Sequence, residues 1–125
     1  MQRMHNAKIE GKESIEIWGT GTPKREFLYV DDCADGLIFL MNNYNESDII
    51  NLGTGIEHSI KEIVDMIKEI VGYEGECVYN SEKPDGTMRK VLDISKIDKL
   101  GWKPKIELKD GIKLLYDWYL KEIVT

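Results

Sequence analysis

Five cations of this chain stand beside sharp chain reversals, in two separate loops. The first loop follows Trp-Gly-Thr-Gly-Thr-Pro and the second surrounds a Pro-Asp-Gly turn; the cations are Lys24, Arg25, Lys83, Arg89 and Lys90. Arginine presents a planar fork that binds phosphate through two hydrogen bonds, and lysine adds a point charge. If the two loops meet, they can bind a diphosphate. The alternative, equally open from the residues alone, is that these side chains are simply solvated.

Two further residues of the same loops are candidates for binding. Trp18, at the mouth of the first loop, could stack on a base or a sugar, although a tryptophan that ends a strand more often packs in a core. Asp85 either makes its turn or accepts hydrogen bonds from sugar hydroxyls or a base edge. Both residues are therefore kept as candidates beside the cations.

Other motifs favour structural roles. The Gly-Thr-Gly sequences at 19–21 and 53–55 do not complete Gly-x-Gly-x-x-Gly, so we interpret them as turns and assign no cofactor-binding residue. Asp31 and Asp32 precede a helical pattern and are interpreted as its N-terminal cap rather than as catalytic groups. The two histidines lack metal-ligand spacing, so no metal site is predicted. We assign no catalytic residue within the chain.

Length and charge limit the possible functions. A chain of 125 residues fits one domain with a modest core, and 42% hydrophobic and 32% charged residues indicate a folded, soluble protein. The net charge of −6 disfavours general nucleic-acid binding, because a phosphate backbone attracts positive charge. No apolar run is long enough to cross a membrane. Cys33 and Cys77 are expected to be unpaired core residues, which favours the reducing cytoplasm.

The elements that must position the two loops follow from periodicity and capping signals. We predict the end of a helix in 1–11, strands at 14–18, 27–30, 49–52, 77–79 and 88–92, and helices from 31 onward, at 60–71, at 95–100 and at 108–123. The second helix should bury Cys33, Leu37, Leu40 and Met41, and the last should bury Leu108, Ile112, Leu115 and Tyr119. Ser59 and Glu62 form a capping box, which makes 60–71 the most secure element. No repeat or linker divides the chain, so it is predicted to be a single α/β domain.

Four motifs together resemble a known family. Residues 18–32, Asn-Leu-Gly-Thr-Gly (51–55), Lys-Pro-Asp-Gly-Thr-Met-Arg-Lys-Val-Leu-Asp (83–93) and Leu-Gly-Trp-Lys-Pro (100–104) resemble the C-terminal part of GDP-L-fucose synthase. That enzyme is an extended short-chain dehydrogenase/reductase that converts GDP-4-keto-6-deoxy-D-mannose by 3,5-epimerisation and NADPH-dependent 4-reduction. The first two motifs are shared with many nucleotide-sugar epimerases and dehydratases, whereas the run at 83–90 is narrower and selects the subfamily.

The resemblance implies a fold and a set of ligand contacts. It implies an α/β C-terminal portion, short strands mixed with helices, without the Rossmann N-terminal domain that binds NADP in the full-length family. It also implies that Trp18, Arg25 and Asp85 contact the GDP-sugar and that Lys90 helps to hold its diphosphate. The family's cofactor fingerprint and its catalytic residues would precede Met1, so we expect this chain to bind no NADP alone and to be inert.

Two alternatives stay open at this stage. The chain could be part of another nucleotide-sugar epimerase or dehydratase, or a stand-alone module that binds nucleoside diphosphates without chemistry. Members of the family are typically homodimers. Because the N-terminal domain would complete the family's sheet, we also expect an exposed apolar face and self-association of the chain on its own.

Overall fold

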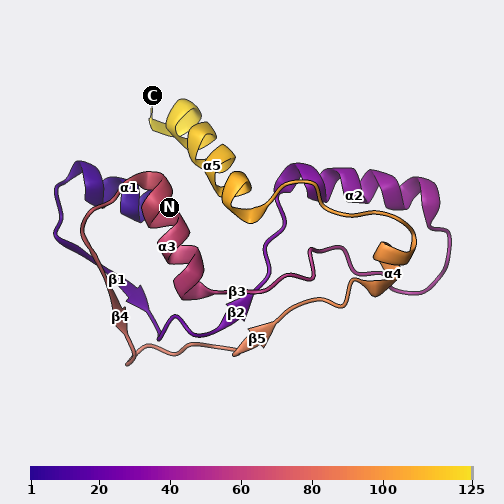
Figure 1. The fold of residues 1–125 in the computed structure, drawn as a ribbon, viewed down its shortest axis with the longest axis horizontal. Coiled ribbons are helices and arrows are strands. Elements are labelled where there is room, and N and C mark those ends of the chain that lie inside the picture. The colour runs from indigo at the N-terminus through magenta and orange to yellow at the C-terminus, as the bar shows by residue number, and fades with distance from the viewer. Residues whose placement is uncertain (125) are drawn as a thin grey trace.

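The computed structural model describes residues 1–124. Five α-helices, five short strands and one π-helical turn follow one another along this part of the chain (Figure 1): α1 (Gln2–Ile9), β1 (Ser14–Trp18), β2 (Lys24–Arg25), α2 (Val30–Asn43), β3 (His58–Ser59), α3 (Ile60–Val71), β4 (Glu76–Asn80), β5 (Arg89–Lys90), α4 (Ser95–Lys99), α5 (Leu108–Tyr119) and η1 (Leu120–Val124). The mixed α/β class predicted from the sequence is confirmed.

Two small sheets carry the strands. β1 pairs with β4 in parallel, with Trp18 opposite Asn80 at the end of the ladder. In the second sheet β2 lies between β3, which is antiparallel to it, and β5, which is parallel to it. Since β2 and β5 come from the two cationic loops, this second sheet brings the loops together.

The main hydrophobic core lies where α1, α3 and α5 gather beside the sheet of β1 and β4 (Figure 1). Its buried members are Met4, Ala7, Val64, Val71, Tyr73 and Tyr116. Ile15 and Ile17 are half-buried against this core while their neighbours in β1 are exposed, as the alternation of the strand predicts.

α3 forms as its capping signals predict. The Ser59 hydroxyl accepts a hydrogen bond from the Glu62 amide at 3.1 Å, and the Glu62 carboxylate accepts one from the Ser59 amide at 2.6 Å. The helix ends at Gly72, whose φ of 67° lies in the left-handed region that glycine adopts without strain. The predicted capping box is therefore confirmed.

The predicted aspartate cap of α2 is wrong. The helix begins after Tyr29, and no side chain caps it. Asp32 is 3% exposed and its Oδ2 accepts hydrogen bonds from the amides of Lys105 and Ile106, at 3.0 and 2.9 Å. A carboxylate in the first turn of a helix can accept hydrogen bonds from the amides of a distant segment as well as from those of its own helix. Here the Asp32 carboxylate binds the amides of the distant segment.

The predicted buried face of α2 is wrong at two of its four positions, while Cys33 and Leu40 are half-buried. Leu37 and Met41 are 54% and 83% exposed, whereas Gly36 is buried. A Cβ at Gly36 would lie 2.5 Å from a Leu52 methyl and 2.9 Å from the Trp102 ring. The helix therefore packs through its glycine, which a pattern based on large apolar residues does not count as a contact.

Two predicted strands do not form in the described residues. Residues 27–29 are irregular and Val30 already belongs to α2, while Ile49 is 90% exposed and 49–52 has no strand partner. A strand needs a neighbour for its backbone groups, and apolar composition alone does not supply one. The strand predicted at 88–92 is reduced to two residues.

The buried face of α5 also differs from the predicted one, because Leu115 is 47% exposed and the buried face runs through Ile112 and Tyr116.

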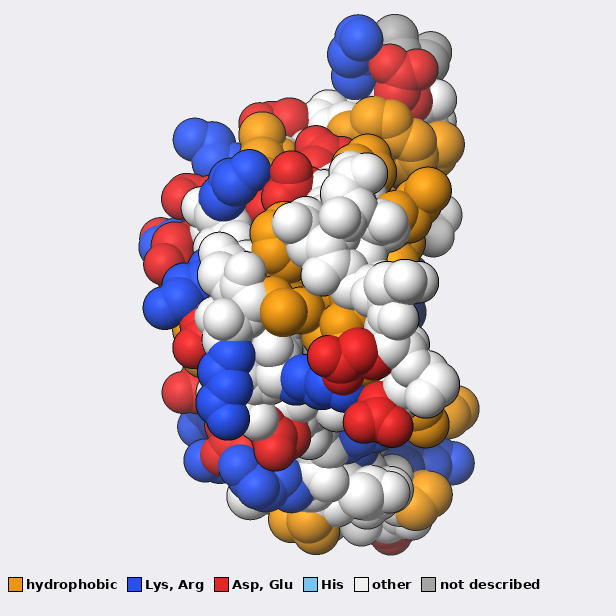
Figure 2. Space-filling view, turned by 90° about the vertical axis from the view of Figure 1, so that its right-hand side faces the viewer, with side chains coloured by type: hydrophobic (Ala, Val, Ile, Leu, Met, Phe, Trp, Pro, Cys, Tyr) orange, Lys and Arg blue, Asp and Glu red, His pale blue; other side chains and the backbone are white. Residues whose placement is uncertain are grey.

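Several hydrophobic side chains reach the surface. On α2 they are Val30, Leu37, Ile38 and Met41, and on α5 they include Leu114, Leu115 and Trp118. Figure 2 shows hydrophobic side chains on one face of the molecule, interrupted by charged side chains.

Cys33 and Cys77 are free and half-buried. Among the residues described, no helix has the length and apolar character needed to span a membrane.

Candidate functional site

The two cationic loops meet, as the diphosphate hypothesis requires. β2 pairs with β5 in parallel, which sets Lys24 opposite Arg89 and Arg25 opposite Lys90. The Lys24 amide also donates a hydrogen bond of 2.8 Å to the Met88 carbonyl. Because successive side chains of a strand point to opposite faces, Lys24 and Arg89 share one face of the strand pair and Arg25 and Lys90 share the other.

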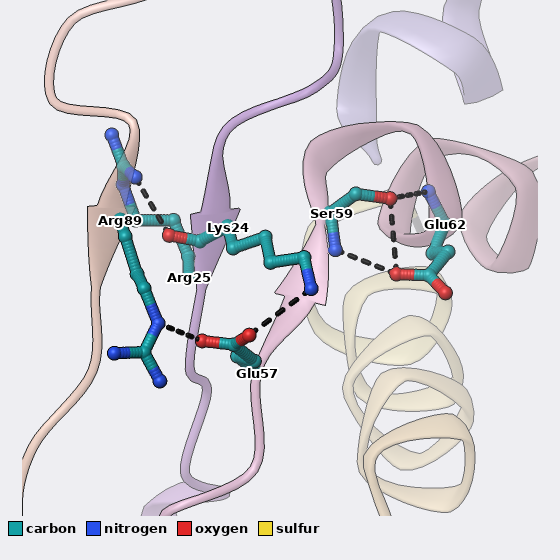
Figure 3. A network of polar contacts seen from close by, with 6 residues as sticks. All are labelled: Lys24, Arg25, Glu57, Ser59, Glu62 and Arg89. Atoms are coloured by element: carbon teal, nitrogen blue, oxygen red, sulfur yellow. Dashed lines mark hydrogen bonds and ion pairs between the residues drawn. The ribbon is translucent and has the colours of Figure 1, made fainter.

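Glu57 offsets part of the positive charge on the first of these faces. Its Oε1 lies 3.0 Å from the Lys24 ammonium and its Oε2 lies 2.6 Å from Nε of Arg89 (Figure 3). The hydrogen bonds from Lys24 and Arg89 hold the pKa of Glu57 below its ordinary value. Two of the five predicted cations thus form a surface ion-pair network with one carboxylate, which lowers the positive charge that they offer to an anion.

The second face keeps its positive charge. Within residues 1–124, neither Arg25 nor Lys90 forms an ion pair with a carboxylate. The half-buried Arg25 donates a 2.7 Å hydrogen bond from Nη1 to the Lys24 carbonyl, and its guanidinium points away from Glu57 (Figure 3). A Cβ at Gly86 would lie 4.0 Å from Arg25 Nη2, so this guanidinium lies between the two loops.

Asp85 fastens the second loop to the first. Its Oδ1 accepts a hydrogen bond from the Thr20 amide and its Oδ2 accepts one from the Thr20 hydroxyl, both at 2.7 Å. Gly19, with a φ of 82°, allows this approach, because a Cβ there would collide with Asp85 Oδ1. The sequence analysis missed the role of Thr20, since a threonine in a glycine-rich turn carries no distinctive signal.

Trp18 is a surface residue and not part of the core. It is 66% exposed, and its indole nitrogen donates a hydrogen bond of 2.9 Å to Glu16 Oε1. The Lys83 ammonium lies 5.5 Å from the ring centroid, within range of a cation–π interaction. The core position that is usual for a tryptophan ending a strand is therefore excluded for Trp18 in this structure.

The remaining glycine-rich features of the loops hold the backbone in place. The first amides of α3, those of Ile60 and Lys61, donate to the carbonyls of Pro23 and Gly21 at 2.9 Å. The Glu26 carboxylate accepts a 3.2 Å hydrogen bond from the Leu92 amide and lies where a Cβ of Gly53 would otherwise be. Both Gly-Thr-Gly sequences are therefore backbone features, as interpreted from the sequence.

The chain contains one pair of residues with a spacing typical of catalytic sites, and this pair was not identified from the sequence. Tyr79 and Lys83 stand four residues apart, the Tyr-x-x-x-Lys spacing in which lysine lowers the pKa of a catalytic tyrosine. Here the Tyr79 hydroxyl is buried, has no hydrogen-bond partner among the described residues, and has its pKa raised by that burial. Lys83 lies over Trp18 instead. The pair lacks the geometry and the pKa direction of such a site.

On the face of Arg25 and Lys90, the Lys90 side chain is exposed and that of Arg25 is half-buried. An apolar cavity of about 150 Å³ lies elsewhere, between residues 27–29 and α5, and none of the four predicted ligand contacts lines it. Within residues 1–124 no group of three or more His, Cys, Asp or Glu side chains is arranged to hold a metal ion.

In fold and in sequence the chain is similar to enzymes that act on nucleotide sugars. Residues 1–53 match the family model described as the NAD dependent epimerase/dehydratase family. A solved GDP-L-fucose synthetase from Naegleria fowleri with NADP bound superposes with a TM-score of 0.92 at 28% identity, over 99% of this chain and 39% of that one.

The resemblance narrows further at the level of sequence. The chain is 49% identical to GDP-L-fucose synthase 1 of Arabidopsis thaliana, over 98% of this chain and 38% of the relative. A GDP-6-OMe-4-keto-L-xylo-heptose reductase from C. jejuni is 50% identical and has a TM-score of 0.83, over 97% of this chain and 37% of that one. The resemblance to GDP-L-fucose synthases is confirmed, and the chain spans about 38% of the length of these curated relatives.

Proposed function

We propose that this chain is the GDP-sugar-binding part of an NADP-dependent GDP-L-fucose synthase-like enzyme. In that enzyme GDP-4-keto-6-deoxy-D-mannose undergoes 3,5-epimerisation and 4-reduction. Residues 1–125 would form a single substrate-binding portion, completed by a separate NADP-binding domain. The free thiols of Cys33 and Cys77 fit the cytoplasmic location that we propose for it.

One observation carries the proposal: the second loop contacts the first at three successive points. Lys83 lies over Trp18, Asp85 binds Thr20, and Gly86 stands beside Arg25. The contacts run from an exposed aromatic ring to the cationic face of Arg25 and Lys90. A nucleoside diphosphate sugar has the matching order of groups, with a flat base at one end, a ribose with its hydroxyls after it, and a doubly charged diphosphate beyond the ribose.

Each proposed contact has its own chemistry. Trp18 offers a ring face to a base or sugar, while Arg25 and Lys90 bind the diphosphate through charge-assisted hydrogen bonds. Asp85 uses one lone pair of each oxygen on Thr20. A carboxylate has about four acceptor positions, so Asp85 can also accept from a sugar hydroxyl at the loop junction.

Reduction requires groups that these residues do not provide. Hydride transfer needs a bound nicotinamide and a positioned proton donor. The two Gly-Thr-Gly sequences serve as backbone turns, and the Tyr79 hydroxyl is buried. The two Gly-Thr-Gly sequences and Tyr79 therefore do not fit NADP. We propose that NADP and the catalytic acid belong to the separate NADP-binding domain and that this chain alone is inactive.

A second candidate function has specific support. The solved heptose reductase from C. jejuni is 50% identical to this chain, and a GDP-mannoheptose C4 reductase from the same organism, with NADP bound, is 48% identical. Two GDP-L-fucose synthases of Arabidopsis thaliana are 49% and 48% identical to this chain, so sequence identity does not separate the two groups. A GDP-4-keto-heptose would present the same GDP group to the loops, so the sugar could differ while the proposed contacts remain.

The proposal is tested by adding GDP and NADPH to the purified chain. GDP binding to the folded state should raise its melting temperature in a concentration-dependent way, and NADPH absorbance should stay constant with a GDP-4-keto sugar present. Oxidation of NADPH would contradict the proposed inactivity. No thermal shift at millimolar GDP would contradict the binding role and favour a purely structural part.

A further inference from the structure

We infer that Glu16 is the positioning residue that orients the Trp18 ring for its ligand. This inference rests on the proposed function, because it assigns to Trp18 the stacking of a base or sugar. Glu16 and Trp18 lie two residues apart in β1 and so project from the same face of the strand. Glu16 Oε1 accepts the indole hydrogen bond at 2.9 Å. Trp18 is 66% exposed, so this bond is a principal restraint on its ring.

Glu16 is itself fixed by the neighbouring strand. Asn80, the partner of Trp18 across the β1–β4 ladder, donates a hydrogen bond of 3.0 Å from Nδ2 to Glu16 Oε2. The orientation of this amide is set in turn, because Asn80 Oδ1 accepts a 3.0 Å hydrogen bond from the Glu82 amide. A continuous chain of hydrogen bonds thus runs from the turn after β4 to the indole of Trp18.

This chain of hydrogen bonds requires two acceptors on residue 16. The indole N–H and the Asn80 amide N–H₂ are both donors, and a carboxylate presents an acceptor oxygen to each. Glutamine presents one oxygen and one N–H₂ group. Turning Asn80 over would not repair the mismatch, since its oxygen already serves Glu82. Glu16→Gln therefore loses one of the two bonds, and the bond that remains is no longer charge-assisted and is weaker, while the size and shape of the side chain are kept.

The ring held in this way stands at the edge of the proposed site. Lys83 lies 5.5 Å from its centroid, so the same ring faces the second cationic loop. A ring that is already oriented loses less conformational freedom when a ligand stacks on it. Immobilising a free side chain on binding costs an amount that corresponds to about a two- to tenfold change in affinity.

The first test reads the Trp18 indole directly. In ¹H–¹⁵N spectra of the ¹⁵N-labelled 125-residue chain, Trp18→Phe identifies the Trp18 indole resonance. Glu16→Gln should shift that resonance and speed its exchange with solvent, while those of Trp102 and Trp118 stay in place. Glu13→Gln is the matched control, because Glu13 is exposed just before β1 and loses the same charge. An unchanged Trp18 resonance in Glu16→Gln overturns the positioning role.

The second test asks whether Glu16 acts through Trp18. Glu16→Gln should weaken GDP binding about two- to tenfold in the wild-type background. In the Trp18→Phe background it should have no further effect, because the group it orients is gone. Equal losses in both backgrounds overturn the inference. Failure of the wild-type chain to bind GDP overturns the proposed function, whereas the indole resonance still decides whether Glu16 fixes the ring.

Discussion

The four cations of β2 and β5 differ in whether they pair with Glu57. Lys24 and Arg89 share its carboxylate, whereas Arg25 and Lys90 lie on the opposite face of the same strand pair. The number of cations in the sequence therefore overstates the charge available to a ligand. At the residue scale the proposed site depends on the unpaired face, and substitutions on the two faces should have different effects.

Arg25→Ala should weaken GDP binding by about 1.5–3 kcal/mol, the usual contribution of a hydrogen bond to a charged group. Calorimetric titration measures this loss. Lys113→Ala, at an exposed position on α5, is the control for the loss of one positive charge and should bind GDP as the wild type does. Equal affinity of the Arg25 variant and the wild type would remove Arg25 from the site.

Glu57 should make the stability of the chain depend on acid. The pKa of Glu57 is lowered in the folded state, so its contribution is fully present above the ordinary glutamate pKa of about 4.3 and is lost as pH falls through the lower folded value. Melting temperatures of wild type and Glu57→Gln should therefore differ at pH 7, and the difference should shrink as pH falls below the ordinary glutamate pKa and through the lower folded value. A difference that stays the same as pH falls through this acid range would show that the ion pairs do not contribute.

At the scale of elements, helix α2 illustrates where sequence patterns stop being informative. Its length and its start near residue 30 follow from periodicity, but its packing depends on Asp32 and Gly36. Asp32 binds the backbone of 105–106, about 70 residues away, and Gly36 is the close contact with Leu52 and Trp102. Neither contact is encoded locally, whereas the capping box of α3 involves neighbours in sequence and was predicted correctly.

Asp31 and Asp32, which look equivalent in the sequence, should respond differently to substitution. Asp32→Ala leaves two backbone amides without their acceptor and should lower the free energy of unfolding by about 2–4 kcal/mol. Asp31→Ala, at an exposed position in the same first turn, should cost about 0.3–1 kcal/mol through the helix dipole. Urea denaturation measures both. Similar costs would restore the interpretation of the pair as a shared cap.

Gly36→Ala tests the close packing of α2. The added methyl would overlap Leu52 and Trp102, so we expect a loss of about 1–3 kcal/mol in the free energy of unfolding, despite the better helix propensity of alanine. Met41 lies on the same helix and its side chain is 83% exposed. Met41→Ala should therefore change the free energy of unfolding by less than about 0.5 kcal/mol. The opposite order would indicate that the buried face predicted from the sequence is correct after all.

At the scale of the whole molecule, the sequence motifs predicted which loops meet better than they predicted the strands. Residues 18–32 and 83–93 do come together, and the α/β class is confirmed. The strands expected at 27–30 and 49–52 are missing from the described residues, since no neighbouring strand satisfies their backbone there. Exposed apolar side chains on α2 and α5 fit our proposal that a further domain completes the enzyme.

The central claim is that the two loops form a site for the GDP group of a nucleotide sugar. Some proteins that are similar to this chain are named as UDP-glucose 4-epimerases, and one of them is 41% identical to it over 111 residues. Titration calorimetry with GDP, UDP and dTDP under identical conditions separates these possibilities most directly. The proposed function predicts that GDP binds most tightly of the three, and tighter binding of UDP would contradict it.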